Sequence, residues 1–247
     1  MKTFYLTDSG KIREHNEDSV IIVKNNHNEY LMTVSDGMGG HSNGELASSM
    51  AIMHLTKNFM GLGKMGSKME TVNWLRDNVN EINQKIFKYT AEHTESKGMG
   101  ATLVVAILTN DYLLFGNVGD SSGFVLKDKK LHKITYDHTL VNLLVSAGEL
   151  TEEQAKQHPR KNVLMKALGV NDPVEIDIFD VDINIDAILL CSDGLTNMLT
   201  QEQIERVLNS DLDINEQVIK LIKKSNNRGG TDNISIAYLI MKSGDNQ

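Results

Sequence analysis

The sequence predicts an α+β fold in which two β-sheets are covered by helices. The prediction depends on three observations: many strand-like runs, polar turns between neighbouring runs, and two long amphipathic helical patterns. Apolar or alternating stretches, which are typical of strands, occupy residues 3–7, 19–23, 30–35, 102–109, 112–118, 122–127, 175–180, 187–191 and 234–240. One small sheet would not need so many strands, so we expect two.

Two turn sequences predict that the sheets are at least partly antiparallel. Residues 109–111 (Thr-Asn-Asp) and 127–129 (Lys-Asp-Lys) each lie beside strand-like runs and carry residues that favour tight turns. Such turns indicate β-hairpins. An antiparallel sheet needs cover on one face only, which leaves room for a layered arrangement.

Two helical patterns follow the third strand-like run and are long enough to cover a sheet. Residues 44–60 place Ala47, Ala51 and Leu55 on one stripe, and residues 71–92 repeat apolar residues at the same spacing. We expect these helices to pack as a pair. The connection at 61–68 is rich in glycine and lysine, and we expect it to be an exposed surface loop.

Capping boxes mark two later helices. Thr151 is followed by Gln154, and Thr200 by Gln203, which is the spacing of a capping box. Between residues 130 and 173 the pattern is helical but interrupted, which predicts a small helical insertion standing on the sheets.

Composition limits the classes of function. The chain has 247 residues and a net charge of −8, which argues against a nucleic-acid or anionic-membrane surface. We expect a single domain over residues 1–243 and a short polar tail at 244–247. No apolar run is long enough to span a membrane, no leader segment precedes the motifs, and Cys191 is the single cysteine. These features predict a cytoplasmic protein with no internal disulfide.

Acidic residues stand at the ends of strand-like runs. Asp36, Asp120 and Asp193 each follow such a run, and glycine comes directly after Asp36 and Asp193. A single Asp-Gly pair is most often an ordinary turn, but several of them together favour a shared cation. Mg²⁺ and Mn²⁺ prefer hard oxygen ligands and keep several waters, so ligands from distant turns can serve. The sequence therefore predicts a hydrolytic metal site.

Covalent catalysis lacks its usual setting in this chain. Cys191 lies in the apolar run 187–191 and is expected to be a small core residue, and no Gly-x-Ser-x-Gly sequence occurs. Two neighbouring ions can activate water for attack on phosphorus without a protein nucleophile.

The motifs at 13–18 (Arg-Glu-His-Asn-Glu-Asp), 36–41 (Asp-Gly-Met-Gly-Gly-His), 98–102 (Gly-Met-Gly-Ala-Thr), 119–121 (Gly-Asp-Ser), 192–194 (Ser-Asp-Gly) and 231–233 (Thr-Asp-Asn) resemble those of the metal-dependent serine/threonine protein phosphatases of type 2C, bacterial branch. The resemblance spans almost the whole chain. It implies an α-β-β-α sandwich of two mainly antiparallel sheets flanked by antiparallel helix pairs. It also implies hydrolysis of phosphoserine and phosphothreonine on proteins by in-line attack of a metal-bridging water, with no phosphoenzyme intermediate.

The resemblance further implies a ligand set for two Mn²⁺ or Mg²⁺ ions and a weaker third. Asp36 would bridge the two ions, the Gly37 carbonyl would bind the second, and Asp193 and Asp232 would complete the first. Asp120 would hold the third ion together with Asp193. Glu17 and Asp18 would reach a metal directly or through water.

Two more residues are candidates for the chemistry. Arg13 would clamp the phosphate, because its planar fork matches two phosphate oxygens. His41 could protonate the departing oxygen, or it could simply be a residue at the start of a helix. Eukaryotic members of the family carry a histidine where this chain has Met38.

One position departs from the family pattern. Ser122 stands where the family usually has arginine after Gly-Asp-Ser, which puts the local ion pair in question. Residues 130–173 resemble the family's flap and include Asp137, His138 and Thr139, with His138 read as a residue of a capped helix and not as a metal ligand.

Two classes of function are compatible with this fold, an enzyme and a module that only binds phosphoproteins. Degenerate relatives should lose metal aspartates or the arginine, and this chain retains both, which favours the phosphatase. The resemblance implies phosphoprotein substrates, among them a serine/threonine kinase, and we expect a monomer.

Overall fold

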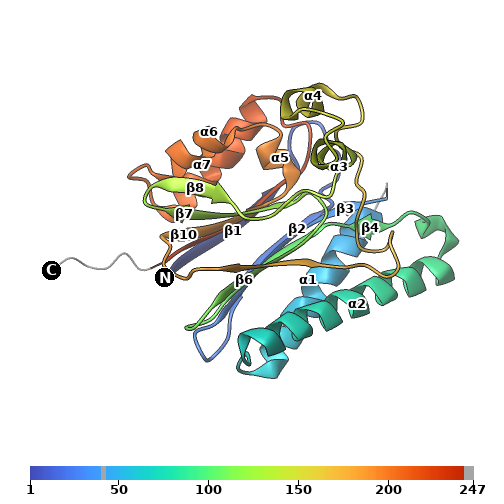
Figure 1. Cartoon of the computed structure of the whole chain (residues 1–247), viewed down its shortest axis with the longest axis horizontal. Coiled ribbons are helices and arrows are strands. Elements are labelled where there is room, and N and C mark those ends of the chain that lie inside the picture. Colours follow the sequence, from blue (N-terminus) through green and yellow to red (C-terminus); the bar gives the residue numbers. More distant parts are fainter. Residues whose placement is uncertain (40–42, 242–247) are drawn as a thin grey trace.

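The computed structural model describes residues 1–39 and 43–241. Two antiparallel sheets lie face to face, with a helix pair on each outer face (Figure 1). The predicted layered α-β-β-α sandwich is thus confirmed. Residues 244–247, predicted as a tail, and His41 lie outside the described residues.

One sheet contains the strands that frame the acidic motifs of the first half of the chain. Its order is β2-β3-β5-β6-β9, and the short β4 pairs with the end of β3. The strands are β2 (Asp18–Lys24), β3 (Tyr30–Met38), β4 (Gly100–Ala101), β5 (Leu103–Leu108), β6 (Leu113–Val118) and β9 (Asp177–Val181).

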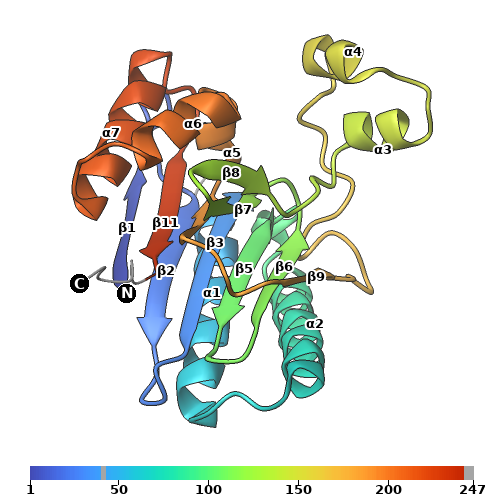
Figure 2. The ribbon, with the colours of Figure 1, turned by 60° about the vertical axis from the view of Figure 1, so that its left-hand side comes forward.

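The other sheet brings the two ends of the chain together. Its order is β1-β11-β10-β7-β8, so the N-terminal strand pairs with the last one (Figure 2). Its strands are β1 (Lys2–Asp8), β7 (Ser122–Lys127), β8 (Lys130–Lys133), β10 (Ala187–Cys191) and β11 (Ile234–Ile240).

The predicted hairpins are confirmed at both turns. Strands β5 and β6 pair across residues 109–112, and β7 pairs with β8 across Asp128 and Lys129. Asp128 and Lys129 both have positive φ, at 50° and 63°, which is the conformation that a tight two-residue hairpin requires.

Helix pairs cover the outer faces through separate apolar clusters. Helices α1 (Asn43–Leu62) and α2 (Lys68–Glu92) bury residues such as Leu55, Phe59 and Leu75 against the sheet of β3 and β5. Helices α6 (Gln201–Leu208) and α7 (Ile214–Asn227), with the short α5 (Asp193–Thr196), cover the other sheet. A third cluster fills the space between the two sheets.

Two helices differ from the sequence prediction, and both begin with a capping box. Helix α2 begins before the first residue of the apolar pattern because Ser67 and Glu70 form a capping box. Helix α7 was not predicted, although Asp213 and Glu216 form the same motif at its start.

The expectation of an exposed loop at 61–68 was wrong in part. Met65 is only 4% exposed and belongs to the core beneath α1 and α2. The buried Glu29 carboxylate accepts a hydrogen bond from the Met65 amide (2.8 Å), and Asn25 donates to the Gly63 carbonyl (2.7 Å). A single methionine thus anchors a loop that otherwise looks polar.

The predicted helical insertion at 130–173 also needs correction. The segment starts with strand β8 and contains two short helices, α3 (Leu140–Ser146) and α4 (Glu152–Gln157). A short 3-10 helix, η1 (Thr94–Ser96), lies outside it, between α2 and β4. The rest of the segment is loop. Figure 2 shows α3 and α4 standing away from the sandwich, and we call residues 134–173 the flap.

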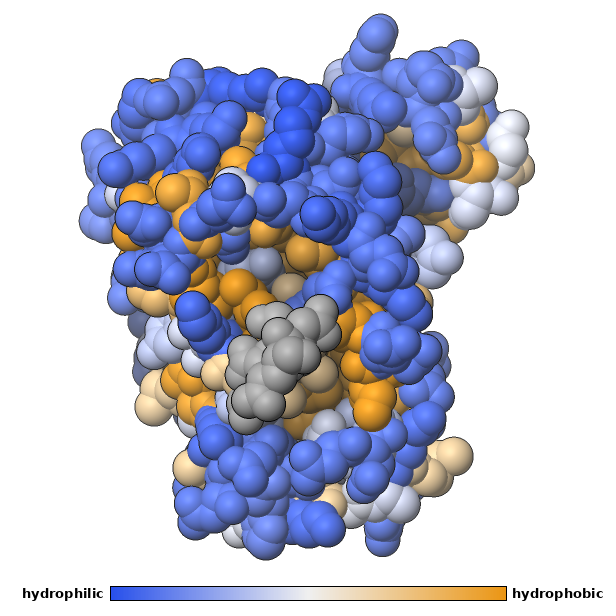
Figure 3. All heavy atoms as spheres, turned by 90° about the vertical axis from the view of Figure 1, so that its left-hand side faces the viewer, coloured by the Kyte–Doolittle hydropathy of each residue, from blue (hydrophilic) through white to orange (hydrophobic). Residues whose placement is uncertain are grey.

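Hydrophilic side chains dominate the face shown in Figure 3, with smaller apolar patches between them. No helix in the described ranges is long and apolar enough to cross a bilayer. Cys191 is fully buried in β10, as expected, and burial raises the pKa of its thiol far above the usual range.

Candidate metal centre

Asp18 and Asp36 lie opposite each other at one end of the first sheet. Asp18 is the first residue of β2, Asp36 is close to the end of β3, and the two are direct partners in the antiparallel ladder. Ser192, just after β10 in the other sheet, donates to Asp18 Oδ2 (2.7 Å). The two sheets therefore meet at this pair.

Strand direction brings the other aspartates to the same end. The end of β6 pairs with the start of β5, so Asp120 follows β6 on the side where β3 ends. In the second sheet, the end of β10 pairs with the start of β11, which places Asp193 and Asp232 together. The motifs that are distant in sequence thus converge because the strands are antiparallel.

Burial and mutual repulsion raise the pKa values of these carboxylates. Burial raises the pKa of Asp36 well above its ordinary value, and the charges of Asp18, Asp193, Asp120 and Asp232 raise it further. Burial also raises the pKa of Asp18 to about 7, of Asp120 to about 8 and of Asp193 to about 6. Such a cluster is stabilised by positive charge at its centre.

Several acidic oxygens are ready to accept a cation. Asp18 Oδ1, Asp193 Oδ1 and Glu17 Oε1 are buried and have no hydrogen-bond partner within the described part of the chain. Buried carboxylate oxygens without a donor are costly, so a bound ion would satisfy them. In these same residues no group of three or more His, Cys, Asp or Glu side chains is already arranged as a metal-ligand set. The unpartnered carboxylate oxygens of Asp18, Asp193 and Glu17 are the hard donors that Mg²⁺ and Mn²⁺ prefer, and such ions keep several waters.

Gly37 and Gly44 let the backbone and the start of α1 approach Glu17. A Cβ on Gly37 would lie 2.0 Å from the Gly44 carbonyl oxygen, and one on Gly44 would lie 2.7 Å from Glu17 Oε1. The Gly37 amide donates to the Glu17 carbonyl (3.1 Å). No other residue type fits here, which explains the glycine after Asp36.

The comparisons with known proteins agree with this geometry. The family model for protein phosphatase 2C matches residues 11–229. The chain belongs to the protein phosphatase 2C family. It is therefore a protein phosphatase, a hydrolase, and phosphatases of this family depend on metal ions.

Relatives in this family match over nearly the full length. The serine/threonine phosphatase Stp of Listeria monocytogenes is 41% identical over 237 residues, which cover 96% of this chain and 94% of the relative. The protein phosphatase PhpP of Streptococcus pneumoniae is 34% identical, with 99% of both chains covered.

Solved structures of the 2C family share the fold. A serine/threonine phosphatase of S. agalactiae superposes with a TM-score of 0.92 at 34% identity, covering 98% of this chain and 99% of that one. PstP of Mycobacterium tuberculosis gives a TM-score of 0.86 at 30% identity, with 98% and 99% covered.

Arg13 lies beside the acidic cluster of this 2C phosphatase. Its Nη2 donates to Asp232 Oδ2 (2.9 Å), and its Nε donates to the Thr231 carbonyl (3.4 Å). The side chain is 48% exposed, so one edge of the guanidinium contacts protein while the rest faces solvent. Among the described residues, Arg13 is the cation that touches a predicted metal ligand.

Asn233 positions this part of the site, a role that the sequence reasoning missed. Its side chain accepts from the Glu17 amide (2.9 Å) and donates to the carbonyls of Ser9 (3.0 Å) and His15 (2.9 Å). The oxygen and both N–H groups of the side-chain amide are thus bound to the loop at 9–17. The Thr-Asp-Asn motif contained the signal, since an asparagine directly follows the metal aspartate.

A lysine of the neighbouring strand lies close to Ser122. Lys133 of β8 donates to both carboxylate oxygens of Asp137 (2.7 Å each), while Ser122 Oγ lies 3.5 Å from the same carboxylate. Lys133 also lowers the pKa of Asp120, although burial and the charges of Asp193 and Asp137 outweigh it.

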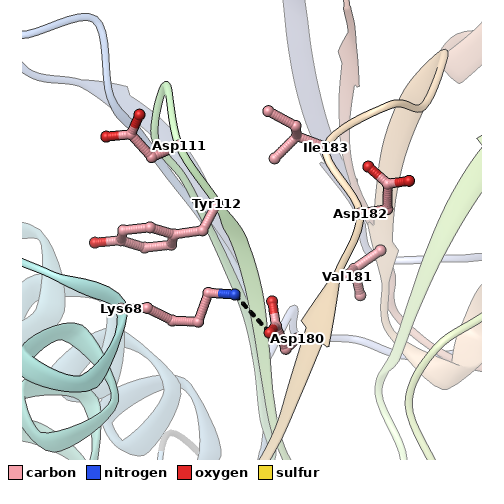
Figure 4. Close-up of a pocket in the computed structure, with 7 residues that line it drawn as sticks. All are labelled: Lys68, Asp111, Tyr112, Asp180, Val181, Asp182 and Ile183. Atoms are coloured by element: carbon pink, nitrogen blue, oxygen red, sulfur yellow. Dashed lines mark hydrogen bonds and ion pairs between the residues drawn. The ribbon is translucent and has the colours of Figure 1, made fainter.

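Two hollows lie beside β6 and β9 of the first sheet, at the end opposite the aspartates. One of about 290 Å³ is bordered by Lys68, Asp111, Tyr112 and Asp180 (Figure 4), and one of about 450 Å³ adjoins it. Tyr112 precedes β6, whereas Asp120 follows it, so the hollows are a strand's length from the aspartates. Lys68 is already paired with Asp180 (2.6 Å).

Proposed function

We propose that the protein hydrolyses phosphoserine and phosphothreonine in other proteins, with two Mn²⁺ or Mg²⁺ ions and a weaker third. The convergence of acidic side chains that raise one another's pKa at one end of the sandwich carries this proposal. The full-length similarity to proteins named serine/threonine phosphatases supports the substrate class.

Asp36, the Gly37 carbonyl, Asp193 and Asp232 would hold the first two ions, with Asp36 between them. Asp120 would hold the third ion together with Asp193, and Glu17 and Asp18 would act directly or through water. The buried, unpartnered oxygens of Asp18, Asp193 and Glu17 support this assignment. The ions, when bound, would acidify water and neutralise charge on the phosphate oxygens.

Arg13, which lies outside the ligand set, would bind and orient the phosphate. Arg13 would turn its solvent-facing N–H groups toward two phosphate oxygens while its other edge stays on Asp232 and Thr231. Cys191 is fully buried, so the thiol cannot reach a substrate. This supports hydrolysis without a phosphoenzyme.

The departing serine or threonine oxygen needs a proton. His41 is our candidate donor, because a histidine near its ordinary pKa can supply one near neutral pH. Substrates would be phosphorylated proteins, including a serine/threonine kinase, and the protein would act as a monomer.

Phosphate release from a phosphothreonine peptide tests the proposal. We expect turnover with Mn²⁺, none after the metal is removed with a chelator, and recovery when Mn²⁺ is added back. Absence of turnover while Mn²⁺ is demonstrably bound would instead support a module that only binds phosphoproteins.

A further inference from the structure

His138 makes a reciprocal contact with the turn that carries Asp120. The His138 amide donates to the Gly119 carbonyl (2.9 Å), and the Gly119 amide donates to His138 Nδ1 (3.0 Å). Both backbone polar groups of Gly119 are therefore bound to one residue of the flap.

The ring of His138 has a defined tautomer in this arrangement. Since Nδ1 accepts a hydrogen bond, the ring proton is on Nε2, from which it is donated to Asp177 Oδ2 (3.0 Å). Lys166 donates to the other oxygen of Asp177 (2.9 Å). His138 is 12% exposed in its side chain, so water competes little for these bonds.

The turn at Gly119 has little freedom apart from this contact. Its φ of +102° favours glycine, and a Cβ would lie 2.6 Å from Thr102 Cγ2. The fully buried Asn117 donates to the Gly119 carbonyl (3.1 Å) and to the Tyr136 carbonyl (2.9 Å). A movement of residues 136–138 would therefore be transmitted to Gly119 and to the adjacent Asp120.

The same residue joins the outgoing and returning parts of the flap. The Met165 amide donates to the His138 carbonyl (2.8 Å). Three residues further on, Leu168 exchanges two backbone hydrogen bonds with Ala101 (2.9 and 3.1 Å), and Ala101 pairs with Gly37. The flap is thus tied to the Asp120 turn on one side and to the segment after Asp36 on the other.

We propose that His138 is a positioning residue that couples the flap to the ion site at Asp120. Thr139, not His138, caps α3, since its hydroxyl accepts from the Asn142 amide (3.3 Å). His138 holds the Gly119 turn with its backbone N–H and Nδ1. Its carbonyl accepts from Met165 in the returning part of the flap, and its Nε2 donates to Asp177 of β9. The expected effect on ion binding rests on the proposed function, whereas the contacts of His138 with Gly119 and the flap do not.

Three variants separate the two contacts. His138→Ala removes both side-chain bonds. His138→Asn places an amide oxygen near the position of Nδ1 and so retains the bond from Gly119, but not the bond to Asp177. His132→Ala is the matched control, because His132 is an exposed histidine of the adjacent β8.

Mn²⁺ titration by calorimetry and amide hydrogen exchange of the whole chain are the readouts. We expect His138→Ala to bind the weakest ion at least tenfold less tightly, as is usual when a residue behind a metal ligand is lost, with the other ions within about twofold of wild type. Exchange at 139–168 should be at least fivefold faster. His138→Asn should retain ion affinity and still exchange faster, and the control should match wild type.

Wild-type ion affinities together with unchanged exchange in a folded His138→Ala variant would overturn the inference. Equal weakening of every ion would also overturn it, because that result indicates a general structural role. A wild-type chain that takes up no Mn²⁺ would refute the proposed function and the expected effect of His138 on ion binding. Hydrogen exchange in the metal-free protein would still decide whether His138 holds the flap.

Discussion

Arg13 Nη2 lies 2.9 Å from Asp232 Oδ2, so the predicted phosphate clamp is held against a predicted metal ligand. The pair joins the loop before β2 to the turn before β11. Asp232 also accepts from the Asn233 amide through its other oxygen (2.9 Å). One carboxylate thus orients the guanidinium at the edge of the metal centre.

Replacing Arg13 should weaken substrate binding. For Arg13→Ala we expect KM for a phosphothreonine peptide to rise about 10- to 100-fold, because a hydrogen-bonded charge contributes about 1.5–3 kcal/mol. Steady-state kinetics measure the effect. Arg76→Ala, which removes an exposed arginine of α2, is the control. A KM within twofold of wild type would exclude Arg13 as the clamp.

Asp193 and Asp120 should differ in their importance. We expect Asp193→Ala to lose more activity than Asp120→Ala, because the proposed ligand set uses Asp193 at two ions and Asp120 at the weaker one alone. Comparison of kcat at saturating Mn²⁺ checks the order. Similar, nearly wild-type rates for both variants would remove support for this assignment.

The metal-free protein should lose stability as the pH rises. The folded-state pKa values of Asp193, Asp18 and Asp120, about 6, 7 and 8, all exceed the ordinary 3.8. These groups therefore favour the folded state fully below about pH 4, and this stabilisation is lost as the pH rises from there through each folded-state pKa, up to about pH 8. We expect the Tm of chelated protein to fall over this interval.

Mn²⁺ should reverse this loss. At 100 times its Kd an ion that binds only the folded state adds about 2.7 kcal/mol, and more ligands are ionised at pH 8 than at pH 5.5. Thermal unfolding with Mn²⁺ and with chelator should thus diverge as the pH rises, and Asp120→Asn should flatten the profile of the chelated protein. Equal Tm values at pH 8 with and without Mn²⁺ would contradict the proposed metal centre.

Gly37→Ala should destabilise the protein by at least about 2 kcal/mol, because the new methyl group would overlap backbone atoms of Gly44 and Glu17 that cannot move away cheaply. Denaturant unfolding measures it. Gly61→Ala is the matched control, since a Cβ there meets nothing within 4 Å and lies in α1, so it should stabilise by up to about 1 kcal/mol. Equal stability of the two variants would refute this packing argument.

Lys133 should compensate for the serine at 122. Lys133→Met leaves Asp137 without its ion pair, and both partners are partly exposed, so we expect a loss of about 1 kcal/mol or less and a Tm lower by about 1–4 °C. Lys127→Met, which breaks the longer and more exposed pair with Asp182 (3.9 Å), should change little.

A second substitution tests whether Lys133 does replace the family arginine. Ser122→Arg in the Lys133→Met background should restore the Tm, because an arginine at 122 starts within 3.5 Å of the Asp137 carboxylate. A further drop in Tm would show that the buried position of Ser122 no longer accommodates the larger cation.

The sequence by itself determined most elements of the fold and the family to which the chain belongs. Apolar or alternating runs predicted the strands at 122–127, 187–191 and 234–240 with the bounds observed. The acidic turns made Asp36, Asp120 and Asp193 candidate metal ligands, and the family resemblance added Asp232. These signals are local, since they come from alternation, capping and turn residues. Within 130–173 the helical pattern was interrupted, so the sequence predicted helices there without the bounds of α3 (Leu140–Ser146), whose apolar stretch is short.

Only the tertiary structure decided which residues meet. Sheet order, which depends on packing over the whole chain, opposes Asp18 to Asp36, brings Arg13 to Asp232 and places Asp137 beside Ser122. It also buries Met65 under the helices and turns His138 toward Gly119. No local pattern encodes these contacts, because each joins segments whose pairing is set by strand direction and by the burial of apolar faces elsewhere.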